Sequence, residues 1–400
     1  MIVKPMIRSN ICLNAHPVGC ATETERQIAY VQAQKARRGS EGGTGPRAAL
    51  VLGCSTGYGL ASRITAAFAY GARTLGVSFE KVGTETKSGT PGWYNNAAFD
   101  RAAGKAGIPS LTLNGDAFSD DMRKAVIAEA KKQGYAFDLV VYSLASPVRT
   151  DPETGVLYKS VLKPIGAPYS GKTVDPMSGV ISEVSALPAD DAEAAETVKV
   201  MGGEDWERWI RQLGDADVLA KGCLAVAYSY IGPALSHAIY RDGTIGEAKK
   251  HLEQTARSLD AVLQARCGGH AFVSVNKGLV TRSSAVIPVI PLYLVLLFKV
   301  MKEKGTHEGC IEQMERLFAE RFYTPSGDIP VDDERLIRID DREMDASVQA
   351  EVNRRLAEVS EANLAALGDM DGYRHDFLAT NGFDVAGVDY GADVPRMDAI

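Results

Sequence analysis

The stretch Ala48-Ala49-Leu50-Val51-Leu52-Gly53-Cys54-Ser55-Thr56-Gly57-Tyr58-Gly59 decides the fold class of this 400-residue chain. Its first five residues are all apolar, which predicts a strand buried on both faces of a parallel sheet. The glycines that follow have the spacing G-x-x-x-G-x-G and precede a helical pattern over Leu60–Tyr70. Such glycines let the backbone turn tightly and approach a pyrophosphate at a helix N-terminus. The stretch therefore predicts a dinucleotide site.

Expected strands and helices alternate along the sequence that follows. The strands are Thr74–Phe79, Ser110–Leu113, Asp138–Leu144, Cys223–Tyr228 and Ala271–Val275, and the helices are Asp120–Gln133, Thr244–Ala265 and Ser283–Lys302. Strands that alternate with helices of ten or more residues indicate a doubly wound parallel sheet. We therefore predict an α/β, Rossmann-like fold.

Three parts of the chain are expected to form a single structural unit. Residues 1–47 are an N-terminal arm packed on the core, residues 48–305 are the Rossmann-like core, and residues 306–400 are a mainly helical C-terminal extension. Residues 149–200 interrupt the core with five prolines and several glycines, and we expect inserted hairpins there.

Composition excludes several classes of protein. The chain has 44 Lys plus Arg against 51 Asp plus Glu, a net charge of −7, which argues against a nucleic-acid platform. The six cysteines form no C-x-x-C pair and the six histidines have no ligand spacing, so we expect reduced thiols and no metal. The N-terminus carries no export signal, which predicts a cytoplasmic location. The apolar run Ser284–Phe298 is shorter than the roughly twenty residues of a membrane span, and it contains Pro288 and Pro291, so we expect a buried helix.

Glu80 follows the second strand, about twenty residues after the glycine-rich turn. An acidic residue at this position accepts hydrogen bonds from the adenosine ribose hydroxyls and repels a 2′-phosphate, so we predict a preference for NADH. Lys81 would soften that preference, and a solvated surface glutamate is the alternative interpretation. Asp116, in Asn114-Gly115-Asp116-Ala117, is placed to bond the adenine amine, and the small residues of Ser143–Pro147 leave room for a cofactor. Each of these two segments also reads as an ordinary strand-end turn.

Tyr240 and Lys249 are a candidate acid–base pair. Thr244 and Glu247 have the pattern of a capping box, which places Lys249 in the first two turns of a helix close to Tyr240. A lysine ammonium favours the ionised form of a nearby tyrosine, whose hydroxyl can bond an oxyanion and supply a proton. Eight residues separate the two, and a tyrosine and lysine this far apart are usually unrelated. Tyr230, after the expected strand Cys223–Tyr228, is a competing aromatic residue, with packing alone as its other interpretation.

Ser229-Tyr230-Ile231-Gly232-Pro233 and the stretch from Tyr240 to Lys249 resemble the tyrosine–(eight residues)–lysine signature of the bacterial trans-2-enoyl-CoA and enoyl-acyl-carrier-protein reductase family. The similarity covers essentially the whole chain. Further similar stretches are Met1–Met6, Asn14–Pro17, Gly53–Gly59, Gly76–Lys81, Gly89–Asn96, Val141–Pro147 and Tyr373–Phe377.

The resemblance implies an enlarged fold of the short-chain dehydrogenase/reductase type and NADH-dependent reduction of the C2–C3 double bond of an enoyl-CoA or enoyl-acyl-carrier-protein. It implies Tyr240 as the proton donor, Lys249 as its partner and Tyr230 as a substrate contact. It implies a monomer in which the apolar helix after Arg282 helps to cover the acyl chain. The NAD contacts that it implies are Gly53, Cys54, Ser55, Thr56, Gly57, Tyr58, Phe79, Glu80, Asp116, Ala117, Leu144, Ala145, Lys249, Leu279, Val280 and Thr281.

Other functions fit parts of the same pattern. A ketone-reducing short-chain dehydrogenase is the nearest enzymatic alternative, and a nucleotide-binding protein without catalysis is another. Methyltransferases that use S-adenosylmethionine also place an acidic residue after the second strand, but they need no tyrosine–lysine pair.

Overall fold

The structure is a computed structural model and describes residues 2–8, 11–39, 44–281, 284, 287 and 290–394. Its centre is a seven-stranded sheet in the order β13-β12-β11-β6-β3-β4-β5, and all neighbouring strands are parallel. The strands are β3 (Ala48–Leu52), β4 (Arg73–Ser78), β5 (Ser110–Asn114), β6 (Phe137–Tyr142), β11 (Leu219–Ser229), β12 (His270–Val275) and β13 (Leu336–Arg338). The predicted doubly wound sheet is confirmed. Its strand order reverses at β3, and ligands of such sheets bind outside the carboxyl ends of the strands at this point.

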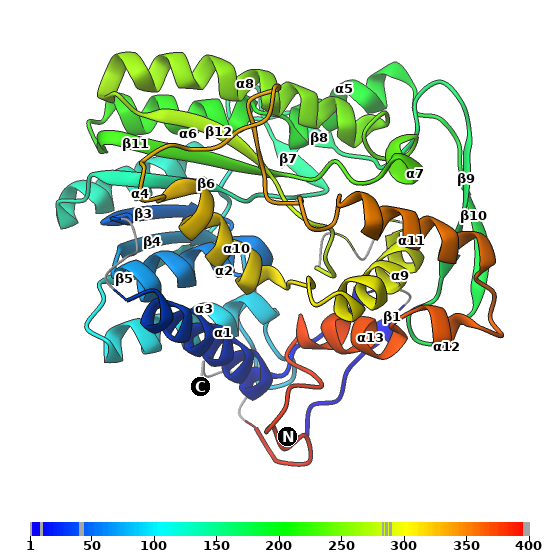
Figure 1. Cartoon of the computed structure of the whole chain (residues 1–400). Helices are drawn as coiled ribbons and strands as arrows, with labels where there is room; N and C mark the ends of the chain where they lie inside the picture. The colour runs from blue at the N-terminus through cyan, green and yellow to red at the C-terminus, as the bar shows by residue number, and fades with distance from the viewer. Residues whose placement is uncertain are drawn as a thin grey trace.

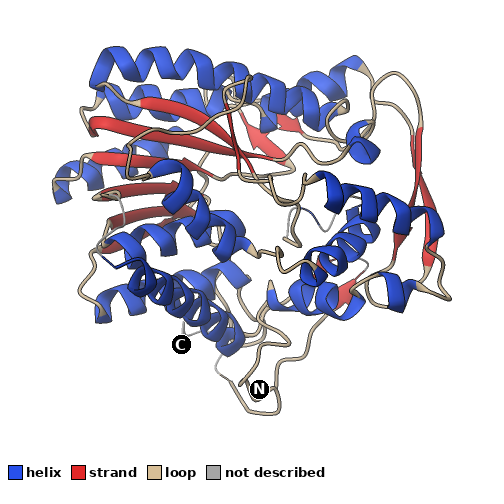
Figure 2. Cartoon of the chain, in the orientation of Figure 1, coloured by secondary structure: helices blue, strands red, loops and turns tan. Residues whose placement is uncertain are grey.

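Helices cover both faces of the sheet (Figures 1 and 2). Ala48, Leu50 and Leu52 of β3 point to the face that carries α4 (Asp120–Gln133), α6 (Glu204–Asp215) and α8 (Thr244–Cys267). Ala49 and Val51 point to the opposite face, with α1 (Pro17–Arg38), α2 (Gly57–Ile64), α3 (Pro91–Lys105) and α10 (Cys310–Leu317). The continuous apolar strand is explained by this double coverage, because its side chains alternate between two buried faces.

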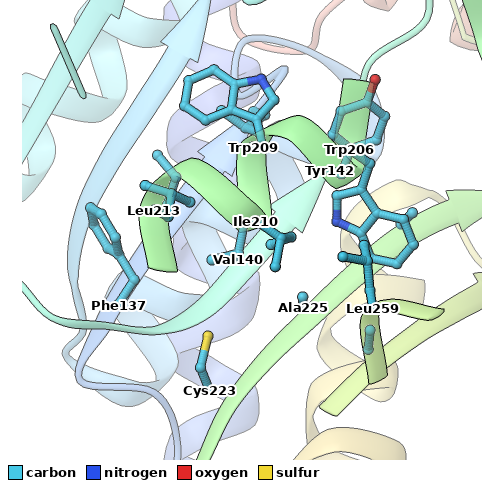
Figure 3. Close-up of a cluster of buried hydrophobic side chains, with 14 of the residues drawn as sticks. Phe137, Val140, Tyr142, Trp206, Trp209, Ile210, Leu213, Cys223, Ala225 and Leu259 are labelled. Atoms are coloured by element: carbon cyan, nitrogen blue, oxygen red, sulfur yellow. The ribbon is translucent and has the colours of Figure 1, made fainter. Parts of the chain in front are cut away.

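Helix α6 anchors the first of these faces, as Figure 3 shows. Its Trp206, Trp209 and Leu213 are fully buried against β6, β11 and α8. Burial of a large apolar side chain stabilises a fold by roughly 1.5–3 kcal/mol. This face therefore holds β6 and β11 rigidly, and both strands end at the candidate site.

A third core surrounds α9 (Ile290–Glu303), whose residues Leu292–Leu297 are all buried. It is packed by α11 (Ala346–Glu358), α12 (Leu364–Leu367), α13 (Met370–Ala379) and the hairpin of β9 (Tyr169–Val174) and β10 (Ile181–Ala186). The part of the apolar run that lies in α9, from Ile290 to Phe298, is thus in a core helix. Residues 282–283, 285–286 and 288–289 lie outside the described part of the chain. Among the described residues, every helix is too short or too polar to span a bilayer.

Several elements differ from the prediction. The region assigned to an arm contains the 22-residue helix α1. The insertion has the expected hairpins, β7 (Val148–Thr150) with β8 (Leu157–Lys159) and β9 with β10, but also α5 (Asp191–Met201). The seventh strand, β13, comes from residues assigned to the C-terminal extension, and at three residues it is too short to show a period. The expected helix over Leu60–Tyr70 is α2 continued by a π-helical turn, η2 (Thr65–Ala69). The remaining elements are β1 (Ile7–Arg8), β2 (Ile11–Cys12), α7 (Ala234–His237) and η4 (Phe318–Phe322).

Candidate active site

The glycine-rich turn links the end of β3 to the start of α2. Gly53 has φ +84°, and a Cβ on it would lie 2.2 Å from the carbonyl oxygen of Ser143, so no other residue fits there. Gly57 has φ +55° and opens α2, where the preceding residue, Thr56, makes no side-chain cap. The first amides of α2 therefore have no side-chain cap, and a helix N-terminus of this kind attracts an anion.

Glu80 lies beside this turn. Its Oε1 accepts a hydrogen bond of 2.6 Å from the hydroxyl of Ser55. Its backbone is fixed by Asn114, which bonds both the amide and the carbonyl of Glu80 at 2.8 Å. The turn after β3 and the acidic residue after β4 are thus brought together, as the sequence predicted. Phe79, the preceding residue, is 78% exposed.

The other strand-end residues line the same edge of the sheet. Asp116 uses Oδ1 to accept the amide of Phe118 at 2.9 Å, so half of its carboxylate closes a local turn. Ala117 is buried, and its carbonyl accepts the indole N–H of Trp209 at 3.0 Å. Leu144 lies against the glycine-rich turn, with Cδ2 3.2 Å from the position of a Cβ on Gly53, and Ala145 is exposed.

The segment after β12 faces the glycine-rich turn from the other side. The methyl group of Thr281 lies 3.9 Å from the position of a Cβ on Gly57. The hydroxyl of Tyr58 donates to the carbonyl of Lys277 at 2.5 Å. Leu279 and Val280 are buried, and the hydroxyl of Ser284 donates to the carbonyl of Leu279 at 2.6 Å. Gly57 and Thr281, far apart in the sequence, therefore lie side by side.

Tyr240 and Lys249 each contact a residue at or just after the end of β11. The Tyr240 ring stands edge-on to the ring of Tyr230, with 5.2 Å between centroids and 71° between planes. The Lys249 ammonium donates to the carbonyl of Tyr228 at 3.2 Å. Burial raises the pKa of Tyr240 and lowers the pKa of Lys249 to about 8, an effect that the charge of Glu253 partly opposes. Both groups are therefore protonated at neutral pH.

The capping box predicted at Thr244 and Glu247 is wrong. The N-cap of α8 is Gly243, which has no side-chain cap. The hydroxyl of Thr244 instead donates to the carbonyl of Val161 at 2.5 Å and accepts the amide of Lys163 at 3.2 Å. The hydroxyl is thus used to fasten the insertion to the start of α8.

Glu343 and Lys277 are two buried charged residues that the sequence analysis did not single out. Glu343 accepts three hydrogen bonds, from Tyr230, Tyr293 and the amide of Gly278. The Lys277 ammonium donates to the carbonyl of Gly278 at 3.0 Å, and burial lowers its pKa to about 8. Glu343 follows β13, so recognition of that strand would have placed it at this edge of the sheet. Lys277 lies two residues after the end of β12, so the feature in the sequence that could have indicated it was a charged residue close after an apolar strand.

Three family models match consecutive parts of the chain. They are described as the NAD(P)H binding domain of trans-2-enoyl-CoA reductase (residues 2–85), the trans-2-enoyl-CoA reductase catalytic region (87–323) and an enoyl reductase FAD binding domain (331–394).

Individual proteins are similar over the whole length. The chain is 62% identical to a trans-2-enoyl-CoA reductase [NADH] of Treponema denticola, with all of both chains covered. It is 52% identical to an enoyl-[acyl-carrier-protein] reductase [NADH] of Flavobacterium johnsoniae, with 99% of this chain and 98% of the relative covered. The crystal structure of the Treponema denticola reductase in complex with NAD superposes with a TM-score of 0.97 at 62% identity and covers 100% of both chains.

Proposed function

The chain belongs to the trans-2-enoyl-CoA reductase family, and on that premise we propose that it reduces the C2–C3 double bond of trans-2-enoyl thioesters with NADH. The observation that carries this proposal is the buried Tyr240, whose ring packs on the ring of Tyr230 just after β11. In the same sheet, β3 leads into the glycine-rich turn at the corresponding carboxyl end.

The residues around the glycine-rich turn fit a dinucleotide. Gly53 and Gly57 keep the backbone bare where a pyrophosphate approaches, and the start of α2 supplies amide donors. Glu80 stands where the adenosine ribose binds and disfavours a 2′-phosphate. NADH, when bound, supplies the hydride for the β-carbon of the enoyl group. We assign the remaining contacts to Cys54, Ser55, Thr56, Tyr58, Phe79, Asp116, Ala117, Leu144, Ala145, Leu279, Val280 and Thr281.

Tyr240 is the proton donor of this proposal. Its raised pKa keeps the proton on the hydroxyl at neutral pH, which a general acid requires. The hydroxyl donates a hydrogen bond to the thioester oxygen as negative charge develops there, and its proton then passes to the α-carbon. Such proton transfer contributes about 10²–10⁴-fold to a rate.

Lys249 acts beside it as a fixed cation. Its ammonium has three donors, of which one is used by the Tyr228 carbonyl. The other two are available to the hydroxyls of the nicotinamide ribose. The positive charge also favours loss of the Tyr240 proton when the substrate takes it.

The acyl chain has an apolar wall available. Gly278 lies between the Tyr230 hydroxyl and Leu294 of α9, which are 3.1 Å and 3.2 Å from the position of a Cβ on it. The faces of α9 that meet this segment are apolar and buried. We propose that the enoyl group binds against Tyr230 as a substrate contact, with α9 helping to cover the acyl chain.

A flavin does not fit the segment whose family model is named for FAD. Residues 331–394 contain no glycine before Gly368, and so no glycine-rich turn after β13. Their buried apolar side chains, such as Val352, Leu364 and Tyr373, pack on α9 instead. We therefore derive no step through a flavin.

The test follows the absorbance of NADH in the presence of crotonyl-CoA and, separately, a panel of ketones. Rapid oxidation with crotonyl-CoA alone is expected. Turnover of ketones alone would favour a ketone reductase, and NADH binding without turnover would favour a sensor. A Tyr240→Phe variant with full activity would remove the acid–base proposal.

The family resemblance also supports a monomer that acts in the cytoplasm on a thioester of CoA or of acyl carrier protein. All six cysteines are free thiols, as is usual in a reducing compartment. Size-exclusion chromatography tests the first point. Steady-state rates with short and long enoyl-CoAs against enoyl-acyl-carrier-protein identify the carrier and chain length.

A further inference from the structure

Glu343 lies behind the candidate active site and joins three of its elements. The amides of Ile339 and Asp340 both donate to the carbonyl of Val275 at 3.1 Å, which holds the chain after β13 against the end of β12. Glu343 follows three residues later and is fully buried. A carboxylate in such a position is costly unless its oxygens accept hydrogen bonds.

Both oxygens of Glu343 have donors. Oε1 accepts the hydroxyls of Tyr230 (3.1 Å) and Tyr293 (2.7 Å), and Oε2 accepts the amide of Gly278 (2.6 Å). These donors belong to the segment after β11, to α9 and to the segment after β12. The carboxylate therefore joins Tyr230 to α9 and to the segment after β12, elements that Figure 1 traces.

Lys277 supplies the opposite charge. It is 1% exposed, and its ammonium bonds the carbonyl of Gly278, whose amide bonds Glu343. Burial raises the pKa of Glu343, while the charge of Lys277 and the hydrogen bonds from Tyr293 and Gly278 oppose that rise. Gly278 is thus bonded through its amide to Glu343 and through its carbonyl to Lys277, two residues of opposite charge.

The two tyrosines of the site consequently differ in what they can donate. A tyrosine hydroxyl has a single proton. The proton of Tyr230 points to Glu343, so it is not available to a thioester oxygen at the same time. The Tyr240 hydroxyl makes no hydrogen bond to any residue in the described part of the chain, and its proton is available.

We propose that Glu343 is a positioning residue for the reduction: it engages the Tyr230 hydroxyl, fixes the Tyr230 ring against Tyr240, and leaves Tyr240 as the one proton donor. This inference rests on the proposed function. It assigns Glu343 no contact with substrate, because the side chain acts through Tyr230.

The experiment is a double-mutant cycle between Glu343 and Tyr230, with crotonyl-CoA and NADH. Glu343→Asp withdraws the carboxylate from Tyr230 but keeps its charge, and Tyr230→Phe keeps the ring but removes the hydroxyl. Each is expected to lower kcat by about tenfold with KM for NADH within about twofold of wild type. The double variant is expected to lose no more than about twofold beyond Tyr230→Phe, because both changes remove one contact.

Two further variants separate positioning from stability. Glu343→Gln keeps an oxygen that accepts both hydroxyls but turns its NH2 group toward the amide of Gly278, so a lower melting temperature is expected while kcat stays within about threefold of wild type. Tyr293→Phe removes the other hydroxyl from the same oxygen, and it is expected to lower the melting temperature while kcat stays within about twofold.

Multiplicative losses in the cycle, about 100-fold in all, would overturn the inference. So would a Tyr230→Phe variant with wild-type kcat, which decides the matter even if Glu343→Asp does not fold. Wild-type protein is assayed first. If it does not oxidise NADH with crotonyl-CoA, the proposed function fails; if it does and the cycle is multiplicative, only the role of Glu343 fails.

Discussion

The ammonium of Lys249 donates a hydrogen bond of 3.2 Å to the carbonyl oxygen of Tyr228, the second-last residue of β11. Tyr230 follows two residues later, and its ring packs edge-on against the ring of Tyr240. The end of β11 thus contacts a lysine directly and, through Tyr230, a tyrosine, and eight residues separate this lysine and tyrosine in the chain.

Tyr240→Phe should remove the proton donor and keep the cofactor site. We expect kcat to fall by about 10²–10⁴-fold, the usual contribution of a general acid. Affinity for NADH, measured by fluorescence titration, should be unchanged because the ring and its contact with Tyr230 remain. A variant that keeps more than a third of wild-type activity would contradict the assignment.

Lys249→Met should weaken NADH binding as well as turnover, because the ammonium is proposed to bond the ribose and to act on Tyr240. Lys250→Met is the matched control, since Lys250 is paired with Glu247 at 2.8 Å on the outer side of α8. Titration calorimetry with NADH measures the effect. Intact affinity together with lost activity would mean that Lys249 acts on the tyrosine alone.

Glu80→Ala should improve the use of NADPH, because it removes the carboxylate that Ser55 bonds and that we propose faces the ribose. We expect the ratio of kcat/KM for NADPH to that for NADH to rise by about tenfold or more, the effect of about 1.4 kcal/mol. Glu85→Ala, in an exposed loop nearby, is the control. An unchanged ratio would show that Glu80 does not face the ribose.

The pH dependence of NADH binding should reflect the ionisation of Lys249. Its pKa of about 8 is below the ordinary value because burial disfavours the ammonium. Binding of NADH should therefore weaken as pH rises through about 8, when the ammonium loses its proton. The free energy of unfolding should instead rise with pH over this range. Between this pKa and that of an exposed lysine, the unfolded chain binds more protons than the folded chain, so raising the pH favours the folded chain.

Chemical denaturation and NADH titration at the same pH values separate these two trends. Lys277 is also buried with a pKa of about 8, so it adds to the trend in stability. A loss of NADH affinity that follows a loss of folded protein would contradict the prediction.

The parts of the fold that were predictable have strong local patterns. β3 and α4 have the predicted bounds because one is a continuous apolar run and the other is a long helix with a serine N-cap. The charged helix α1 buries few residues, and β13 has only three, so neither shows a clear period. These two elements depend on packing partners far away in the chain.

The residues of the candidate site also differ in how strongly the local sequence indicated them. Gly53 and Glu80 could be predicted because the turn and the acidic residue follow strands at a spacing that dinucleotide binding imposes. Tyr240 and Lys249 were only a weak candidate pair from the residues, because eight residues separate them, and the resemblance then implied their roles. Glu343 had no signal at all, because its place depends on β13 joining the sheet edge. At Thr244 a local pattern was misleading: the sequence suggested a capping box, but its hydroxyl bonds residues 161 and 163 instead.

The position of β13 has a consequence for synthesis of the protein on the ribosome. The edge strand and Glu343 are translated long after β3, β11 and both tyrosines. A nascent or prematurely terminated chain that stops before residue 336 holds the dinucleotide turn but has neither the edge strand nor the carboxylate under Tyr230. Cofactor binding and full turnover should therefore appear at different chain lengths, and only full turnover reports that translation has passed Glu343.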